Sequence, residues 1–188
     1  MSRVSVTPQE FHFVKFDAAE VAELTSKLAD AIGLPADAVI EIDIDESTPT
    51  TRVRTDSVDP IKLHLEGGAI EDPTVPRTLS DRLAADVIGR LLLRANDRRS
   101  GGFADAPADG ELDLMQQTAW DTACMGRLER LGYDVRKPRR QYHFRNRHGF
   151  SDVADTVFER LWAADSVTWA DIEAACAETA SSRGAATV

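Results

Sequence analysis

The chain has 188 residues and a formal net charge of −10, a size that permits one domain with a sizeable buried core. Its acidic balance disfavours general binding to nucleic acid or to an anionic membrane, because both carry phosphates that the chain repels. No apolar run is long enough to cross a bilayer and the first residues do not form a signal peptide, so we expect a cytoplasmic protein without membrane contact. Cys124 and Cys176 are too few for a disulfide framework or a zinc site, and we expect buried thiols.

The N-terminal half contains the patterns of strands. Residues 1–16 alternate between apolar and polar side chains and predict two short strands or a hairpin at the edge of a sheet. An amphipathic helix with capping residues at both ends is predicted over 17–33. Residues 39–45 and 61–66 alternate strictly and predict half-buried strands. Together, these predicted elements indicate an α+β fold, in which helices pack on a small, mostly antiparallel sheet within residues 3–70.

A row of acids lies on the polar face of the predicted strand, at Glu41, Asp43 and Asp45. Three carboxylates on one face are a possible ligand set for a divalent cation. Arg52 and Arg54 also alternate, however, and would lie opposite the acids in a hairpin. We favour a solvated ladder of salt bridges and predict no metal site.

The C-terminal half shows helical periodicity. We expect helices over 80–96, 109–132, 151–165 and 168–180, and a mobile loop of small residues over 100–110.

The three tryptophans, Trp120, Trp162 and Trp169, are expected to anchor the packing of this helical half. Residues 1–180 are therefore expected to form a single α+β domain. Residues 181–188 lack apolar periodicity and are expected to form a disordered tail.

The helix predicted over 80–96 contains the sequence DVIGR. In zincin metallopeptidases the helix at this place in the chain has the motif HExxH, often HEIGH, in which two histidines bind zinc and the glutamate activates water. Ile88 and Gly89 match that form of the motif, and the order of elements over residues 17–96 resembles the layout of the zincin family.

The residues that carry the zincin chemistry are replaced. Asp86 and Arg90 stand at the positions of the two histidines, and Val87 stands at that of the glutamate. An Asp and an Arg one turn apart are typical of an ion pair on a helix. The resemblance therefore implies a zincin-like fold without the metal site and without the activity of the family.

The most unusual segment is the basic stretch 136–147, which holds six of the 22 Lys and Arg residues and no acid. As a strand it would place Tyr142, Phe144 and Asn146 on one side and the cations on the other. One interpretation is an anion or partner site. Its candidate binding residues are Arg139, Arg140, Arg145 and Arg147, and its candidates for proton transfer are His143 and His148.

The other interpretation is structural. The cations would then pair with acids of the neighbouring helices, of which the candidates are Glu129, Asp134, Asp152 and Asp155. We favour this interpretation, because charge-rich segments in acidic proteins commonly find internal partners.

No nucleotide-binding loop, nucleophile elbow or metal-ligand cluster is present, so no cofactor is predicted. A dyad of Cys124 with His143 or His148 is disfavoured, because Cys124 lies in the middle of a predicted helix. We expect a non-catalytic binding or scaffold protein whose basic segment contacts an acidic protein or a second copy of the chain. The alternative is an enzyme for a small phosphate- or carboxylate-bearing substrate, bound by the arginines. The segment matches no RNA-binding signature.

Overall fold

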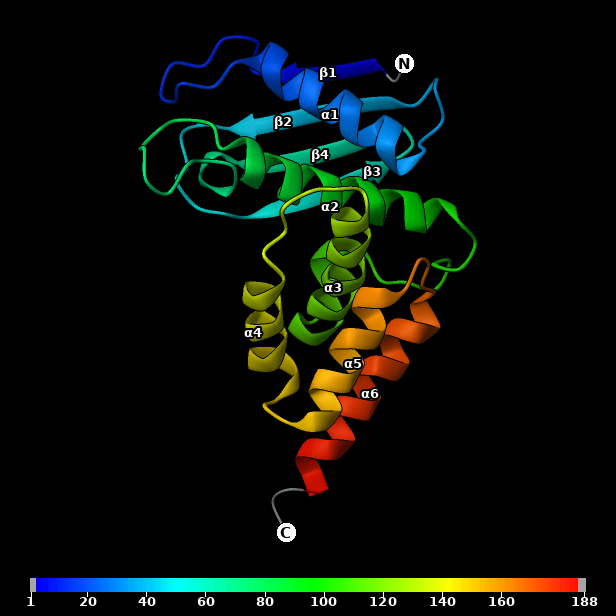
Figure 1. The fold of residues 1–188 in the computed structure, drawn as a ribbon. Coiled ribbons are helices and arrows are strands. Elements are labelled where there is room, and N and C mark those ends of the chain that lie inside the picture. Colours follow the sequence, from blue (N-terminus) through cyan, green and yellow to red (C-terminus); the bar gives the residue numbers. More distant parts are fainter. Residues whose placement is uncertain (1–2, 186–188) are drawn as a thin grey trace. The chain divides into compact units, whose positions relative to one another are not determined.

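The computed structural model describes residues 3–185 and is drawn in Figure 1. The chain divides into two compact units, one ending at Asn96 and the other beginning at Asp97. The boundary falls inside one helix, α2 (Asp81–Arg99). Whether the two units behave as the single domain expected from the sequence stays a prediction.

Among the described residues of the first unit, four strands form one mixed sheet of order β1-β2-β4-β3. β1, β2 and β4 run parallel, and β3 runs antiparallel to β4. In chain order the elements are β1 (Arg3–Thr7), α1 (Ala18–Ile32), β2 (Val39–Asp45), β3 (Val53–Val58), β4 (Ile61–Glu66), the 3-10 turn η1 (Gly67–Ala69) and α2. Figure 1 shows α1 and α2 on the same face of the sheet.

The predicted α+β class is confirmed, but the prediction that the sheet is mostly antiparallel is wrong. α1 forms the connection from β1 to β2, and a helix that returns the chain to its starting end makes the next strand parallel to the first. Of the two alternatives for residues 1–16, the hairpin is wrong, because β1 pairs with β2. The segment forms one named strand, β1, which lies at the edge of the sheet as predicted.

Local signals explain the helix and strand boundaries of this unit. The Asp17 carboxylate accepts a hydrogen bond from the backbone N–H of Ala19 at 2.7 Å, which starts α1. Gly33 ends the helix with φ of 82°, a conformation that favours glycine. The alternate apolar side chains of β2 and β4 are buried, as their period of two predicts; they are Ile40, Ile42, Ile44, Ile61, Leu63 and Leu65.

The acids of β2 form a charged ladder with β4. Glu41 lies opposite Lys62 with 2.9 Å between Oε2 and Nζ, and Asp43 lies opposite His64 with 2.8 Å between Oδ2 and Nδ1. The predicted ladder is therefore present only at Glu41 and Asp43, and its partner strand was predicted wrongly. Asp45 lies opposite Glu66 and accepts hydrogen bonds from the hydroxyls of Ser47 and Thr48. Arg54 lies on β3, which pairs with β4.

The second unit consists of helices α3 (Leu114–Arg130), α4 (Lys137–His148), α5 (Asp152–Ala163) and α6 (Trp169–Ala185), with a 3-10 turn η2 (Asp109–Glu111), as far as the structure describes it. All three tryptophans are buried, which confirms their predicted role as packing anchors. α3 begins later than predicted, because its cap is Asp113, whose carboxylate accepts from the N–H groups of Met115 and Gln116.

The loop over 100–110, expected to be mobile, contacts the core of the second unit near its start. Phe103 is 2% exposed, and its ring stacks on Trp120 with 4.4 Å between centroids. The N–H of Trp169 donates to the carbonyl of Gly102 at 2.9 Å. A buried aromatic side chain thus attaches the first part of a loop of small residues to the core.

α6 continues through Ala185, so the segment expected to be disordered from residue 181 onward begins as helix. The Ser181 hydroxyl donates to the carbonyl of Ala177 at 2.9 Å within this helix. Residues 186–188 of the expected tail lie outside the described residues. Over residues 3–185, no helix has the length and apolar character needed to span a membrane.

Candidate functional site

The basic segment is a helix, α4, and the predicted strand alternation is wrong. Pro138 lies in its first turn, where its fixed φ favours a helix start. Phe144 and His148, one turn apart, are the buried residues of this helix, whereas Tyr142 and Asn146 are exposed. A period of about four, and not of two, therefore decides which side chains of the segment face the core.

Two cations of α4 pair with acids of α5. The Arg145 guanidinium donates from Nε and Nη2 to the two oxygens of Asp155, each at 2.7 Å. Lys137 Nζ lies 2.7 Å from Glu159 Oε2. The hydrogen bonds from Arg145 hold the pKa of the Asp155 carboxyl below its usual range. Arg145, a predicted binding residue, thus serves to join two helices.

The other acids predicted to pair with the basic segment have different roles. Glu129 Oε2 accepts from the indole N–H of Trp162 at 2.7 Å, and Asp134 accepts from the backbone N–H of Arg136 at 3.2 Å. Asp152 lies in the first turn of α5, where a negative charge favours the helix dipole.

Four further basic residues lie within about 100° of one another around the helix axis and form what we call the outer face of α4: Arg139, Arg140, His143 and Arg147. Arg139, His143 and Arg147 are exposed. The pKa of His143 is lowered by partial burial and then by Arg140, Arg139 and Arg147. All the charges that act on this imidazole are therefore cations. The outer face of α4 is a local concentration of positive charge on an acidic chain.

An exposed aromatic pair adjoins this face. Tyr142 is 57% exposed and Phe150 is 67% exposed, and their rings meet edge to face with 6.1 Å between centroids. Large aromatic side chains are usually buried, so two of them in contact at the surface are an unusual feature of this part of the second unit.

His148, the second candidate for proton transfer, is fully buried. Its Nε2 lies 3.1 Å from the carbonyl of Met115, which can only accept, so this nitrogen carries the hydrogen. Nδ1 lies 2.9 Å from the hydroxyl of Thr179, and the ring stacks on Phe144 with 3.9 Å between centroids. The structure therefore separates His148 from the outer face of α4.

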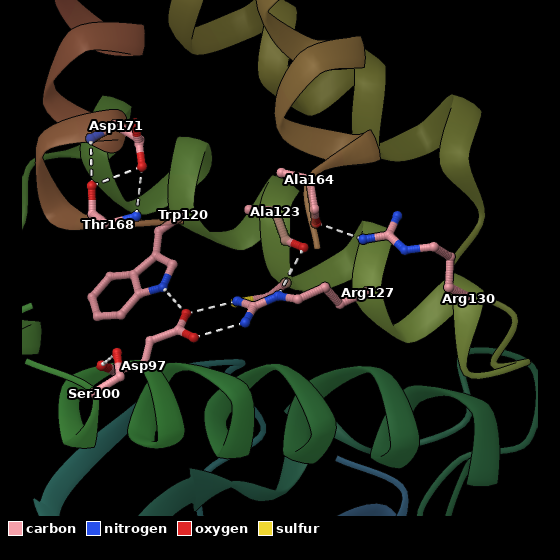
Figure 2. Close-up of polar contacts among 10 residues, drawn as sticks. Asp97, Ser100, Trp120, Ala123, Arg127, Arg130, Ala164, Thr168 and Asp171 are labelled. Atoms are coloured by element: carbon pink, nitrogen blue, oxygen red, sulfur yellow. Dashed lines mark hydrogen bonds and ion pairs between the residues drawn. The ribbon is translucent and has the colours of Figure 1, made fainter. Parts of the chain in front are cut away.

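A buried polar cluster joins the last turn of α2 to α3 (Figure 2). Asp97 accepts hydrogen bonds of 2.7 Å from Trp120 Nε1 and from Nη1 and Nη2 of Arg127. Burial by itself would lower the pKa of the Arg127 guanidinium, but Cys124 and Asp97 raise it above its usual value. The cluster places a salt bridge and an indole hydrogen bond inside the second unit.

Cys124 is buried, as expected, whereas Cys176 is half-buried. Cys124 is fully buried, with its Sγ 3.3 Å from Nη2 of Arg127. Burial, together with Asp113 and Glu173, raises the pKa of the Cys176 thiol to about 12, so this thiol stays protonated at neutral pH.

The stretch DVIGR lies in α2, which confirms that it is helical and places Asp86 and Arg90 one turn apart. The resemblance to zincins itself stays a prediction. Within the described part of the chain, no group of three or more His, Cys, Asp or Glu side chains is arranged to hold a metal ion.

A pocket of about 360 Å³, which we did not predict, lies in the first unit at the carboxyl ends of the parallel strands. It is lined by residues 13–14, 46–49, 67–68 and 76–77, with Glu71. The antiparallel sheet that we expected would have divided the loops after β1, β2 and β4 between two edges. Only the parallel arrangement gathers them at one edge, where open α/β sheets commonly bind ligands.

The chain has no match among protein-family models, among curated proteins or among solved structures.

Proposed function

We propose that this protein is a non-catalytic, cytoplasmic binding protein that holds an acidic segment of another protein on the outer face of α4. The observation that supports this most directly is the division of cations within one helix. Arg145 and Lys137 pair with α5, whereas Arg139 and His143 are exposed among further cations. Ion pairs with α5 therefore explain the presence of only some of the basic residues in this segment.

The aromatic pair extends this surface. Arg and Tyr are enriched in the centres of protein interfaces, where the ring contributes apolar area and the guanidinium binds carboxylates through two hydrogen bonds. Tyr142 follows Arg139 by three residues and thus lies on the same side of α4. An acidic segment that also carries apolar side chains would satisfy both parts of the surface.

An acidic protein suits this surface better than a nucleic acid does. A long polyphosphate would experience the field of a chain with a formal charge of −10, whereas a short acidic segment is held locally. At physiological salt, screening over about 8 Å separates the outer face of α4 from distant acids. A zincin-like fold of residues 17–96 that lacks the metal site is a separate part of the proposal and has no role in this binding.

The alternative, an enzyme for a small anionic substrate, would depend on His143 alone, because His148 is buried. His143 has arginines as its charged neighbours and no described nucleophile or carboxylate to orient it. These surroundings can bind an anion, but they do not supply the second group that acid–base catalysis usually requires.

The test is fluorescence anisotropy with a labelled twelve-residue peptide of glutamate and phenylalanine, titrated with the full-length chain. We expect saturable binding that Arg139→Glu weakens by about tenfold or more, which corresponds to about 1.4 kcal/mol. Arg3→Glu is the matched control, because it makes the same change of charge at an exposed residue of the first unit.

Equal weakening by both substitutions would overturn the proposal, because the effect would then come from net charge and not from the outer face of α4. A single-stranded oligonucleotide of the same charge that binds as tightly as the peptide would also overturn it. Tyr142→Ala leaves the charge unchanged and is expected to weaken peptide binding through the loss of the aromatic pair.

A further inference from the structure

The pocket at the carboxyl ends of β1, β2 and β4 is held in shape by contacts within its own walls. The Glu46 carboxylate accepts hydrogen bonds from the backbone N–H groups of residues 12–14, at 2.6 Å for Phe13 and 2.8 Å for His12. On another wall, a Cβ atom at Gly68 would overlap the carbonyl of Pro49. The backbones of the segments around Gly68 and Pro49 are therefore in direct contact. The pocket is thus pre-formed, as most small-molecule sites are.

Arg77 contributes an unusual feature to this pocket. Its φ is 62°, in the left-handed region that is unfavourable for residues with a side chain. Its backbone is fixed there, because its N–H donates to Glu71 Oε1 at 2.6 Å and its carbonyl accepts from the N–H of Lys15 at 2.6 Å. A glycine would adopt this conformation at no cost, so an arginine here points to a role for its side chain.

The Arg77 guanidinium is available to a ligand. It is exposed, and with the residues that the structure describes it makes no hydrogen bond or ion pair; its contacts are those of its backbone. A guanidinium with a planar pair of donors is suited to a carboxylate.

The other polar side chains that line the pocket offer acceptor atoms to a ligand. Burial raises the pKa of the Glu46 carboxyl, but the backbone N–H groups of residues 12–14 outweigh it and lower that pKa, so this carboxylate is ionised at neutral pH. Glu71 uses one oxygen for the N–H of Arg77. The hydroxyls of Ser47 and Thr48 donate to Asp45, which leaves their lone pairs to accept. A ligand must therefore bring its own hydrogen-bond donor.

We infer that this pocket binds a free amino acid with an apolar side chain. Its carboxylate pairs with Arg77, its ammonium group donates to Glu46 or Glu71, and its side chain packs against apolar walls that include Phe13 and Pro76. A simple anion would be repelled by the two carboxylates, and a simple cation would leave Arg77 without a partner. A zwitterion matches both signs of charge in one small pocket.

Calorimetric titration of the full-length chain tests the ligand class. Phenylalanine is compared with phenethylamine, which lacks the carboxylate, and with 3-phenylpropionate, which lacks the amine. We expect phenylalanine to bind with a Kd below about 1 mM and each analogue to bind at least about tenfold more weakly. Failure of phenylalanine, leucine and methionine to bind, or an analogue that binds as tightly as phenylalanine, would overturn the inference.

The variant Arg77→Gly tests whether the Arg77 side chain binds the amino acid. Glycine keeps the left-handed backbone, so we expect the melting temperature to stay the same or to rise while amino-acid affinity falls at least about tenfold. Arg52→Ala, at an exposed arginine outside the pocket, is expected to keep the affinity. Unchanged affinity in Arg77→Gly would refute the assignment. Neither substitution lies in α4, so this test is independent of binding to the acidic peptide.

Discussion

At the scale of single residues, the buried carboxylate of Asp97 is expected to contribute strongly to the stability of the second unit. It is 7% exposed and accepts three hydrogen bonds, two of them from Arg127. Removing one partner of a buried ion pair leaves the other charge without compensation, which costs more than the pair itself contributes.

We therefore predict that Asp97→Ala lowers the free energy of unfolding by about 3 kcal/mol, measured by urea titration with tryptophan fluorescence. The double variant Asp97→Ala with Arg127→Met is expected to recover at least about 1 kcal/mol of that loss, because no unpaired charge remains. A double variant less stable than Asp97→Ala would contradict this account.

The protonation of His143 should make the affinity for the acidic peptide depend on pH. Because its pKa is lowered from the usual 6.5, the imidazole is neutral at pH 7 and gains its charge only in more acidic solution. We predict that affinity for the glutamate-containing peptide increases as the pH falls from about 7 to about 5, with a midpoint below about 6.5. His143→Gln should remove this increase. An equal increase in that variant would show that another group is responsible.

The same imidazole affects stability in the opposite direction. A lowered pKa means that the folded state binds the proton less tightly than the unfolded state, so protonation of His143 favours unfolding as the pH falls below about 6.5. Binding and stability should therefore respond to acid with opposite signs at this residue.

At the scale of elements, α3 and α5 approach each other closely at Gly126. A Cβ at this position would overlap the carbonyl of Trp162, and backbone atoms cannot move aside as a flexible side chain can. Arg130, one turn later, donates to the carbonyls of Trp162 and Ala164 and so satisfies the end of α5. The contact between these helices depends on a small residue followed by a long cation.

We predict that Gly126→Ala destabilises the second unit by about 2 kcal/mol, although alanine favours helix more than glycine does. Gly110→Ala is the control, since no heavy atom lies within 4 Å of the added methyl group, and its effect should stay within about 0.5 kcal/mol. Denaturant titration of both variants measures this difference. Equal unfolding midpoints for the two variants would refute the close approach of α3 and α5 at Gly126.

Capping signals in the sequence predicted most helices correctly. Ser151 caps α5, and Thr168 with Asp171 forms a reciprocal pair at the start of α6. The start of α3 was missed, because Asp109 matches a cap as well as Asp113 does. Asp109 instead pairs with Arg98 at 2.8 Å, a contact between residues eleven positions apart that no capping pattern contains.

At the scale of the whole molecule, the continuous helix α2 is expected to couple the unfolding of the two units. All three tryptophans lie in the second unit, so their fluorescence reports on that unit alone. α2 is continuous across the boundary, and Asp97 in its last turn belongs to the buried cluster of the second unit. Loss of α2 together with the sheet would remove Asp97 from that cluster.

We predict a single transition, in which a substitution in the first unit lowers the midpoint reported by tryptophan. Gly68→Ala should destabilise the first unit by about 2 kcal/mol, because its methyl group would overlap the carbonyl of Pro49. Fluorescence and far-ultraviolet circular dichroism should then shift together. Gly101→Ala, with no atom within 4 Å, should shift neither. A fluorescence midpoint that stays constant while the dichroism changes would show two independent domains.

The sequence by itself determined the properties that arise between near neighbours along the chain. The faces of β2 and β4, the two ends of α1 and the caps of α5 and α6 follow from period and from hydrogen bonds over a few residues. The tertiary structure alone decided the direction of the strands and hence the pocket, because alternation is the same in parallel and antiparallel sheets. It also decided which cations of α4 are paired, since arginines of one segment are chemically alike and only the position of the acids of α5 distinguishes Arg145 from Arg139.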